Sequence, residues 1–229
     1  MKPVITSGAY GWRQSHWSGG YYPQGLPSGE AEYDKDDWRL NYYSNDFDCV
    51  LLPALDWQSA TVEECASWLD DVHADFEFFV ECHALMDQQS LLHLAEVLAA
   101  LKPQLTALVV TDNHVPGNRM APETALFDLI DSLGINAYGC ELGSKSQDVW
   151  LPGKAVAMPA GQAVDKTPFS DFALFNLDLK DLRQARACVD QFAAQLGADV
   201  SQASIMVNHP QLQAEDLLRF RSVLAMMGY

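Results

Sequence analysis

Eight short apolar segments, separated by stretches of helical periodicity, constrain the fold of this chain more than any other feature. Each is rich in β-branched or aromatic residues, which is typical of strands buried on both faces of a sheet. The expected strands are Val4–Ser7, Phe47–Pro53, Phe76–Cys82, Ala107–Thr111, Ala137–Leu142, Ala155–Met158, Phe172–Leu177 and Ser204–Asn208. This alternation predicts an α/β fold with a parallel sheet, and eight strands match a closed (β/α)8 TIM-like barrel.

Helical segments lie between most of these strands, with apolar residues at every third or fourth position. Thr61 and Glu64 form a capping-box pattern at the start of one helix. Pro122 begins another helix, which Gly134 ends. Further helices are expected over residues 91–101, 182–196 and 212–224.

The interval between the fifth and sixth strands departs from this pattern. Residues 143–153 are too few and too rich in Gly and Pro for a crossover helix, and residues 160–170 also resemble a loop. We therefore expect a barrel with one or two outer helices missing around residues 143–170. The chain has 229 residues and no linker-like segment, so we expect a single domain over residues 1–229.

Charge and cysteine content exclude several classes of partner. The chain has 14 Lys and Arg against 31 Asp and Glu, a net charge of −17. Such a surface repels polyanions, so neither nucleic acid nor a membrane is an expected partner.

The five cysteines are widely spaced and form no C-x-x-C pair, which favours buried thiols in a reducing compartment. With no signal-peptide pattern at the N-terminus, the cytoplasmic compartment is expected.

A long loop rich in aromatic residues and glycine, residues 11–27, follows the first strand. Its sequence resembles the opening motif of the YecE-like family of uncharacterised proteins (domain-of-unknown-function family 72), G-W-x-Y-x-x-W-x-G-x-F-Y-P-x-G-L-P. Gln14 departs from this motif. The matching residues are Gly11, Trp12, Trp17, Gly19, Tyr22, Pro23, Gly25, Leu26 and Pro27. The resemblance implies a TIM barrel and names no reaction.

The resemblance extends to residues 37–50 and to Ile205–His209, while the middle of the chain matches the family only in its alternation of strand-like and helix-like segments. The polar motifs at the strand ends differ. Val80-Glu81-Cys82-His83 stands where the family has V-K-A-P, and Thr111-Asp112-Asn113-His114 stands where it has Q-L-P-P. We therefore expect this chain to use other groups at its strand ends than its relatives do.

Two acid-x-His pairs, Glu81/His83 and Asp112/His114, lie at the ends of the third and fourth expected strands. Residues two apart lie on the same side of a strand, and strand C-termini form the functional face of such a barrel. If these four side chains converge there, they would hold a divalent metal such as Zn²⁺ or Mn²⁺. Alternatively, one of them would act as a general base and another would orient it. The alternative is that they are exposed rim residues or helix N-caps. Cys82 should face the helices as a buried thiol.

A second set of candidates would contact a ligand at the same end of the barrel. It comprises Trp12, Arg13, His16, Trp57, Asn176, Asp178 and Asn208. The aromatic rings would stack on a sugar or a base, with the polar groups as hydrogen-bonding partners. Alternatively, the aromatic residues only plug the top of the barrel.

Two functional hypotheses remain open. The first is a degenerate family member that binds a small-molecule ligand or a protein partner through the C-terminal face of the barrel. The second is a metal-assisted hydrolase or isomerase with a rebuilt site made from Glu81, His83, Asp112, His114 and Asp178. Fold alone does not choose between them, because this barrel hosts many unrelated functions.

Overall fold

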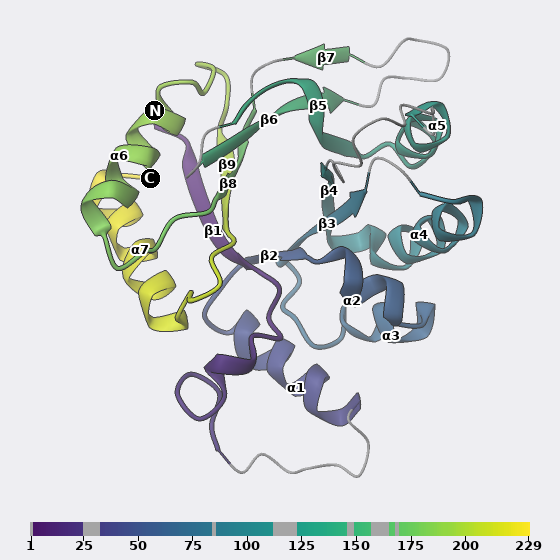
Figure 1. The fold of residues 1–229 in the computed structure, drawn as a ribbon, viewed down its shortest axis with the longest axis horizontal. Helices are drawn as coiled ribbons and strands as arrows, with labels where there is room; N and C mark the ends of the chain where they lie inside the picture. Colours follow the sequence, from purple (N-terminus) through teal and green to yellow (C-terminus); the bar gives the residue numbers. More distant parts are fainter. Residues whose placement is uncertain are drawn as a thin grey trace.

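The strands of the computed structural model form one curved sheet that rolls into a nearly closed barrel with helices outside it (Figure 1). The structure describes residues 2–24, 33–83, 86–111, 123–145, 149–156, 165–167 and 170–229. Its strands are β1 (Val4–Tyr10), β2 (Cys49–Leu52), β3 (Glu77–His83), β4 (Leu105–Thr111), β5 (Asn136–Lys145), β6 (Val149–Val156), β7 (Asp165–Thr167), β8 (Phe172–Phe175) and β9 (Gln202–Val207). The TIM-like α/β fold predicted from the sequence is confirmed.

Strand β6 closes the barrel, and it runs antiparallel to the strands beside it. It pairs antiparallel with β5 on one side and with β8 and β7 on the other, whereas β1–β5, β8 and β9 are joined by parallel pairs. The expectation of a fully parallel wall is therefore wrong at this strand. Only residues 146–148 separate β5 from β6, which is too short for a crossover but sufficient for a hairpin.

The helices cover the outside of the wall except near this hairpin (Figure 1). They are α1 (Tyr33–Ser44), α2 (Ala54–Ser59), α3 (Val62–Ser67), α4 (Gln88–Leu101), α5 (Glu123–Leu133), α6 (Leu182–Ala193) and α7 (Ala214–Met227), with short 3-10 turns at Ser15–Trp17 and Lys102–Gln104. Between α5 and α6 the described residues contain no helix, in agreement with the expected loss of outer helices. Thr61 and Glu64 form the predicted capping box.

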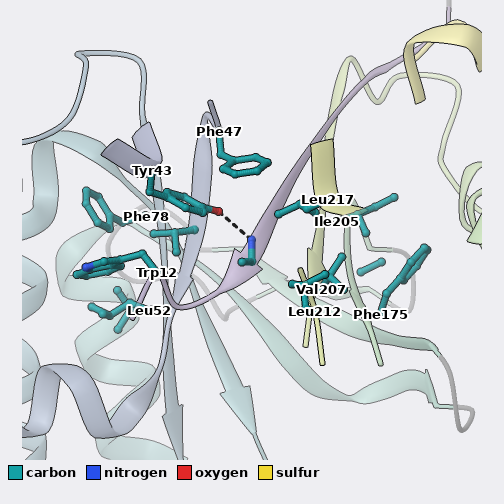
Figure 2. Packing of buried hydrophobic residues seen from close by; sticks show 14 of the residues in the cluster. Trp12, Tyr43, Phe47, Leu52, Phe78, Phe175, Ile205, Val207, Leu212 and Leu217 are labelled. Carbon is teal, nitrogen blue, oxygen red and sulfur yellow. Dashed lines mark hydrogen bonds between the residues drawn. The ribbon is translucent and has the colours of Figure 1, made fainter. Parts of the chain in front are cut away.

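Alternation along the strands separates two layers of buried side chains. The larger layer lies between the wall and the helices, and includes Ile5, Ala9 and Cys82. Cys82 thus packs against the helices, as predicted. The smaller layer fills the inside of the barrel with Cys49, Leu51, Phe79, Ala107, Val109, Tyr138, Phe172, Leu174 and Met206. Figure 2 shows part of the larger layer.

Tyr43 of α1 connects β1 to β2 through its hydroxyl group. The hydroxyl accepts a hydrogen bond from the Ala9 N–H (2.9 Å) and donates one to the Cys49 carbonyl (2.9 Å), and Figure 2 shows the first contact. A Cβ on Gly8 would lie 2.2 Å from the Cys49 carbonyl oxygen, so glycine is required where the strands approach here.

Strand β1 is longer than expected, because it continues from Ser7 to Tyr10. Gly8 and Ala9 are weak strand formers, but the ladder with β9 carries the strand through Ala9. No helix in the described parts of the chain is long and apolar enough to cross a membrane.

Candidate functional site at the carboxyl ends of the strands

Tyr10 and Glu81 meet at the end of the barrel where the parallel strands terminate. Tyr10 is the last residue of β1, and Glu81 lies two residues before the end of β3. The intervening strand β2 stops at Leu52, which pairs with Val80, so the two side chains approach each other beyond its end. The Tyr10 hydroxyl donates a hydrogen bond of 2.5 Å to Glu81 Oε2.

Glu81 is a buried carboxylate, with 8% of its surface exposed. Besides Tyr10, the Ala54 N–H donates to its Oε2 (3.0 Å) and the Thr111 hydroxyl lies 3.2 Å from its Oε1. Its backbone carbonyl accepts the indole N–H of Trp57 (2.7 Å). Burying a carboxylate is costly unless its oxygens have hydrogen-bonding partners, and both oxygens of Glu81 have such a partner within reach.

Thr111 links Glu81 to His83. Its Oγ1 lies 3.3 Å from His83 Nδ1 and 3.3 Å from the Cys82 carbonyl oxygen. His83 is half-buried and lies on the same side of β3 as Glu81. We call Tyr10, Glu81, Thr111 and His83 the Glu81 network: it runs from the buried carboxylate to a partly exposed imidazole.

Tyr10 remains a hydrogen-bond donor over a wide pH range. Burial raises the pKa of its hydroxyl well above the ordinary value of 10, and the hydrogen bond to Glu81 and the charges of Glu81 and Asp56 raise it further. A protonated phenol donates a hydrogen bond to a carboxylate and keeps its proton. The link to Glu81 is therefore maintained at neutral pH.

Asn176 and Asn208 follow β8 and β9 at the same end of the barrel and are half-buried. The Asn208 N–H donates to the Phe175 carbonyl (2.8 Å), which continues the ladder between the two strands. Leu174 and Met206, two residues earlier in each strand, face the barrel interior. Alternation therefore turns both asparagine side chains toward the mouth, on the β8–β9 side of β1.

Asp178 has a local structural role instead. Its Oδ1 accepts the Lys180 N–H (3.0 Å) and its carbonyl accepts the Asp181 N–H (3.2 Å), in the turn before α6. Asp181 then caps α6 by accepting the N–H groups of Arg183 and Gln184. The structure shows no contact between Asp178 and the Glu81 network.

Trp12 and Trp57 pack in the core outside the wall, and Arg13 lies half-buried beside Trp12. Both indole rings are fully buried. Trp12 makes an edge contact with Trp68 (5.2 Å between centroids), and the Arg13 guanidinium lies over both rings at 5.5 and 5.7 Å. Trp12 and Arg13 thus hold the loop after β1 against Trp68 at the end of α3, and both indole rings pack on the helix side of the wall.

His16 and Trp17 attach the same loop to the segment before α7. His16 Nε2 and Trp17 Nε1 both lie 2.6 Å from the Leu212 carbonyl oxygen. His16 is otherwise exposed. The contact ties the first loop of the chain to the last, across β1 and β9.

Asp112 and His114, the second predicted acid-x-His pair, lie outside the described residues. The predicted convergence of four groups is therefore visible only for Glu81 and His83. Within the described parts of the chain, no three or more His, Cys, Asp or Glu side chains are grouped so that they could hold a metal ion. A metal site that uses Asp112 or His114 stays a prediction.

Sequence reasoning missed Tyr10 and Thr111, which complete the Glu81 network. Both are polar residues at the last position of a strand. Tyr10 could have been found by extending the first strand through Gly8 and Ala9. Thr111 could have been found because it ends the strand next to β3.

Comparisons with known proteins agree with this architecture. The sequence model of the family described as "Protein of unknown function DUF72" matches residues 6–137. A DUF72 protein from Thermotoga maritima, TM1631, has a crystal structure that is 16% identical with a TM-score of 0.55, over 97% of this chain and 99% of that chain. A DUF72 protein from Enterococcus faecalis, EF0366, is 11% identical with a TM-score of 0.55, over 97% and 96%.

At these identities the two structures show a common fold and nothing about a site. No curated protein matches the chain. The family match covers more than half of the sequence, in agreement with the resemblance of the loop at residues 11–27. The chain therefore belongs to the DUF72 family of proteins of unknown function.

Proposed function

We propose that the protein binds a small, neutral, polar molecule at the mouth of the barrel, where His83, Asn176 and Asn208 contact it. The observation that carries this proposal is the connection of half-buried His83 through Thr111 to buried Glu81. A histidine that is only a rim residue needs no buried carboxylate behind it. A binding site does, because its groups must be held in one orientation.

The charge of the protein supports a neutral ligand over an anionic one. A net charge of −17 repels small anions as it repels polyanions. Amide and imidazole groups form directional hydrogen bonds with hydroxyl and amide groups, and these are the groups that alternation brings to the mouth. The position at the carboxyl ends of parallel strands is also where such barrels place their ligands.

A thermal-shift screen tests this proposal. Wild-type protein and the variant His83→Gln are heated with monosaccharides, polyols, nucleosides, ZnCl₂ and MnCl₂, each in turn. His73→Gln is the matched control, because His73 precedes β3 at the opposite end of the barrel. A ligand at 100 times its Kd adds about 2.7 kcal/mol to the free energy of unfolding, enough to raise Tm by several degrees.

We expect a neutral compound to stabilise the wild type and His73→Gln, and to lose most of its effect on His83→Gln. Stabilisation by no neutral compound, or by the same amount in His83→Gln, would overturn the proposal. Stabilisation by Zn²⁺ or Mn²⁺ alone, lost in His83→Gln, would replace it with the metal-assisted alternative.

A further inference from the structure

We infer that neutral His83 carries its proton on Nδ1 and presents a bare Nε2 to the ligand, so that the ligand supplies an O–H or N–H donor at this position. The inference rests on the proposed function, and it adds the chemical class of the group that His83 recognises.

The argument begins with the single proton of the Thr111 hydroxyl. Among the described residues, its neighbours besides His83 are Glu81 Oε1 (3.2 Å) and the Cys82 carbonyl oxygen (3.3 Å). A carbonyl and a carboxylate only accept hydrogen bonds, so the hydroxyl proton is directed to one of them. The conclusion is the same whichever of the two receives it, because Thr111 then offers His83 a lone pair.

His83 Nδ1 lies 3.3 Å from that hydroxyl oxygen and must therefore be the donor. In a neutral imidazole only one ring nitrogen carries a proton. The hydrogen bond made by one nitrogen sets the state of the other, so Nε2 is left as an acceptor. Nε2 lies on the side of the ring away from Thr111.

Three other histidines have the opposite arrangement. Nε2 of His16 and Nε2 of His93 lie 2.6 and 3.0 Å from the backbone carbonyl oxygens of Leu212 and Trp57, so both must donate from Nε2. His209 Nδ1 accepts the Gln211 N–H (3.3 Å), which also leaves the proton on Nε2. His83 thus differs from three histidines of the same protein, which serve as internal references.

The bare nitrogen restricts what binds beside it. An ether, ketone or carboxylate oxygen would place one lone pair against another and leave Nε2 without a donor, which is unfavourable. An alcohol or an amide N–H would form a hydrogen bond there. The site therefore selects a polyol or amide and rejects the corresponding ether.

Nuclear magnetic resonance of the full chain, labelled with ¹⁵N in histidine, tests the assignment without a known ligand. At about pH 8, long-range ¹H–¹⁵N correlations distinguish protonated from bare ring nitrogens. We expect a protonated Nδ1 in His83, and a protonated Nε2 in His16, His93 and His209. Thr111→Val should release His83 to the Nε2–H form, while Thr106→Val, on the same strand, should not.

The ligand class is tested by titrating the labelled protein with ethylene glycol and with 1,2-dimethoxyethane, which share a skeleton and differ in O–H groups. We expect the diol to shift the Nε2 resonance of His83 more than that of His93, and the diether to shift neither. Equal shifts from both compounds, or a protonated Nε2 in His83, would overturn the inference. Neither result would affect a thermal shift that depends on His83, so failure of this inference is distinguishable from failure of the proposed function.

Discussion

The hydroxyl of Tyr10 lies 2.5 Å from Oε2 of Glu81 and joins β1 to β3 across the end of the shorter strand β2. The contact holds the carboxylate from one side, while the Ala54 N–H reaches the same oxygen from the start of α2. It is therefore both a part of the candidate site and a tie between neighbouring wall segments.

Replacing Tyr10 with Phe should lower the free energy of unfolding by about 1–3 kcal/mol, the usual cost of depriving a buried polar group of its partner. The ring remains, so packing changes little. Urea unfolding of Tyr10→Phe, Glu81→Gln and the double variant measures the effect. Coupling between the two sites is expected, because they share one hydrogen bond. Strictly additive losses would show that the contact contributes nothing.

Most of the architecture was predictable because apolar runs and helical periods mark the elements directly. That the described residues between α5 and α6 contain no helix was expected from the Gly and Pro content of residues 143–153. The direction of β6 was not predicted, because an apolar run reads the same in either direction. Connection length carries that information only once the strand bounds are known, because both strands extend into the interval that was expected to be a loop and leave three residues between them, enough only for a hairpin.

The candidate site was predictable in part. Glu81 and His83 share a side of β3 because side chains alternate along a strand, and the sequence shows their spacing. The burial of Trp12 and Trp57 was not predictable, since an aromatic side chain serves equally well in a core and against a ligand. Only the contacts with Trp68 and with the Glu81 carbonyl distinguish the two roles.

Alkaline pH should destabilise the protein earlier than its charge alone suggests. Burial raises the pKa of Tyr10, Tyr21, Tyr43 and Tyr138 above the ordinary value of 10. The unfolded chain then loses these protons first, so their stabilising contribution is complete below pH 10 and is lost as the pH rises above it. Burial likewise raises the pKa of the Cys82 thiol to about 12, in the same direction.

The measurement is the free energy of unfolding in urea between about pH 9 and pH 11. Each such tyrosine adds at most about 1.4 kcal/mol of lost stability per pH unit above its unfolded-state pKa. Tyr138→Phe should flatten the decline by up to that amount, because its hydroxyl no longer titrates. An unchanged slope in the variant would contradict the assignment.

Replacing Glu77 with Gln should stabilise the protein at neutral pH. Burial raises the pKa of Glu77, and the charge of Asp48 raises it further, so the folded state favours the protonated carboxyl. As the pH rises through the ordinary value of 4.5 and then through the folded-state pKa, the charged carboxylate becomes a penalty. Gln removes that penalty.

The free energy of unfolding of Glu77→Gln should therefore exceed that of the wild type at about pH 7, and the difference should shrink toward about pH 4. Glu96→Gln is the control, because Glu96 is exposed on α4. A Glu77 variant no more stable than the wild type at neutral pH would show that the carboxylate has a compensating partner.

Replacing Tyr43 with Phe should be the most costly single-atom change in this part of the wall. The Tyr43 hydroxyl is the partner of both the Ala9 N–H and the Cys49 carbonyl, and its side chain is fully buried. Without it, two backbone groups lose their partner together, for a loss of about 2–4 kcal/mol in urea unfolding. Tyr42→Phe, on the neighbouring ring that stacks on Trp38, should change stability far less.

Hydrogen exchange at the Ala9 N–H should accelerate in Tyr43→Phe. If water entered and replaced the hydroxyl, the stability loss would fall below 1 kcal/mol, because a bridging water restores both hydrogen bonds.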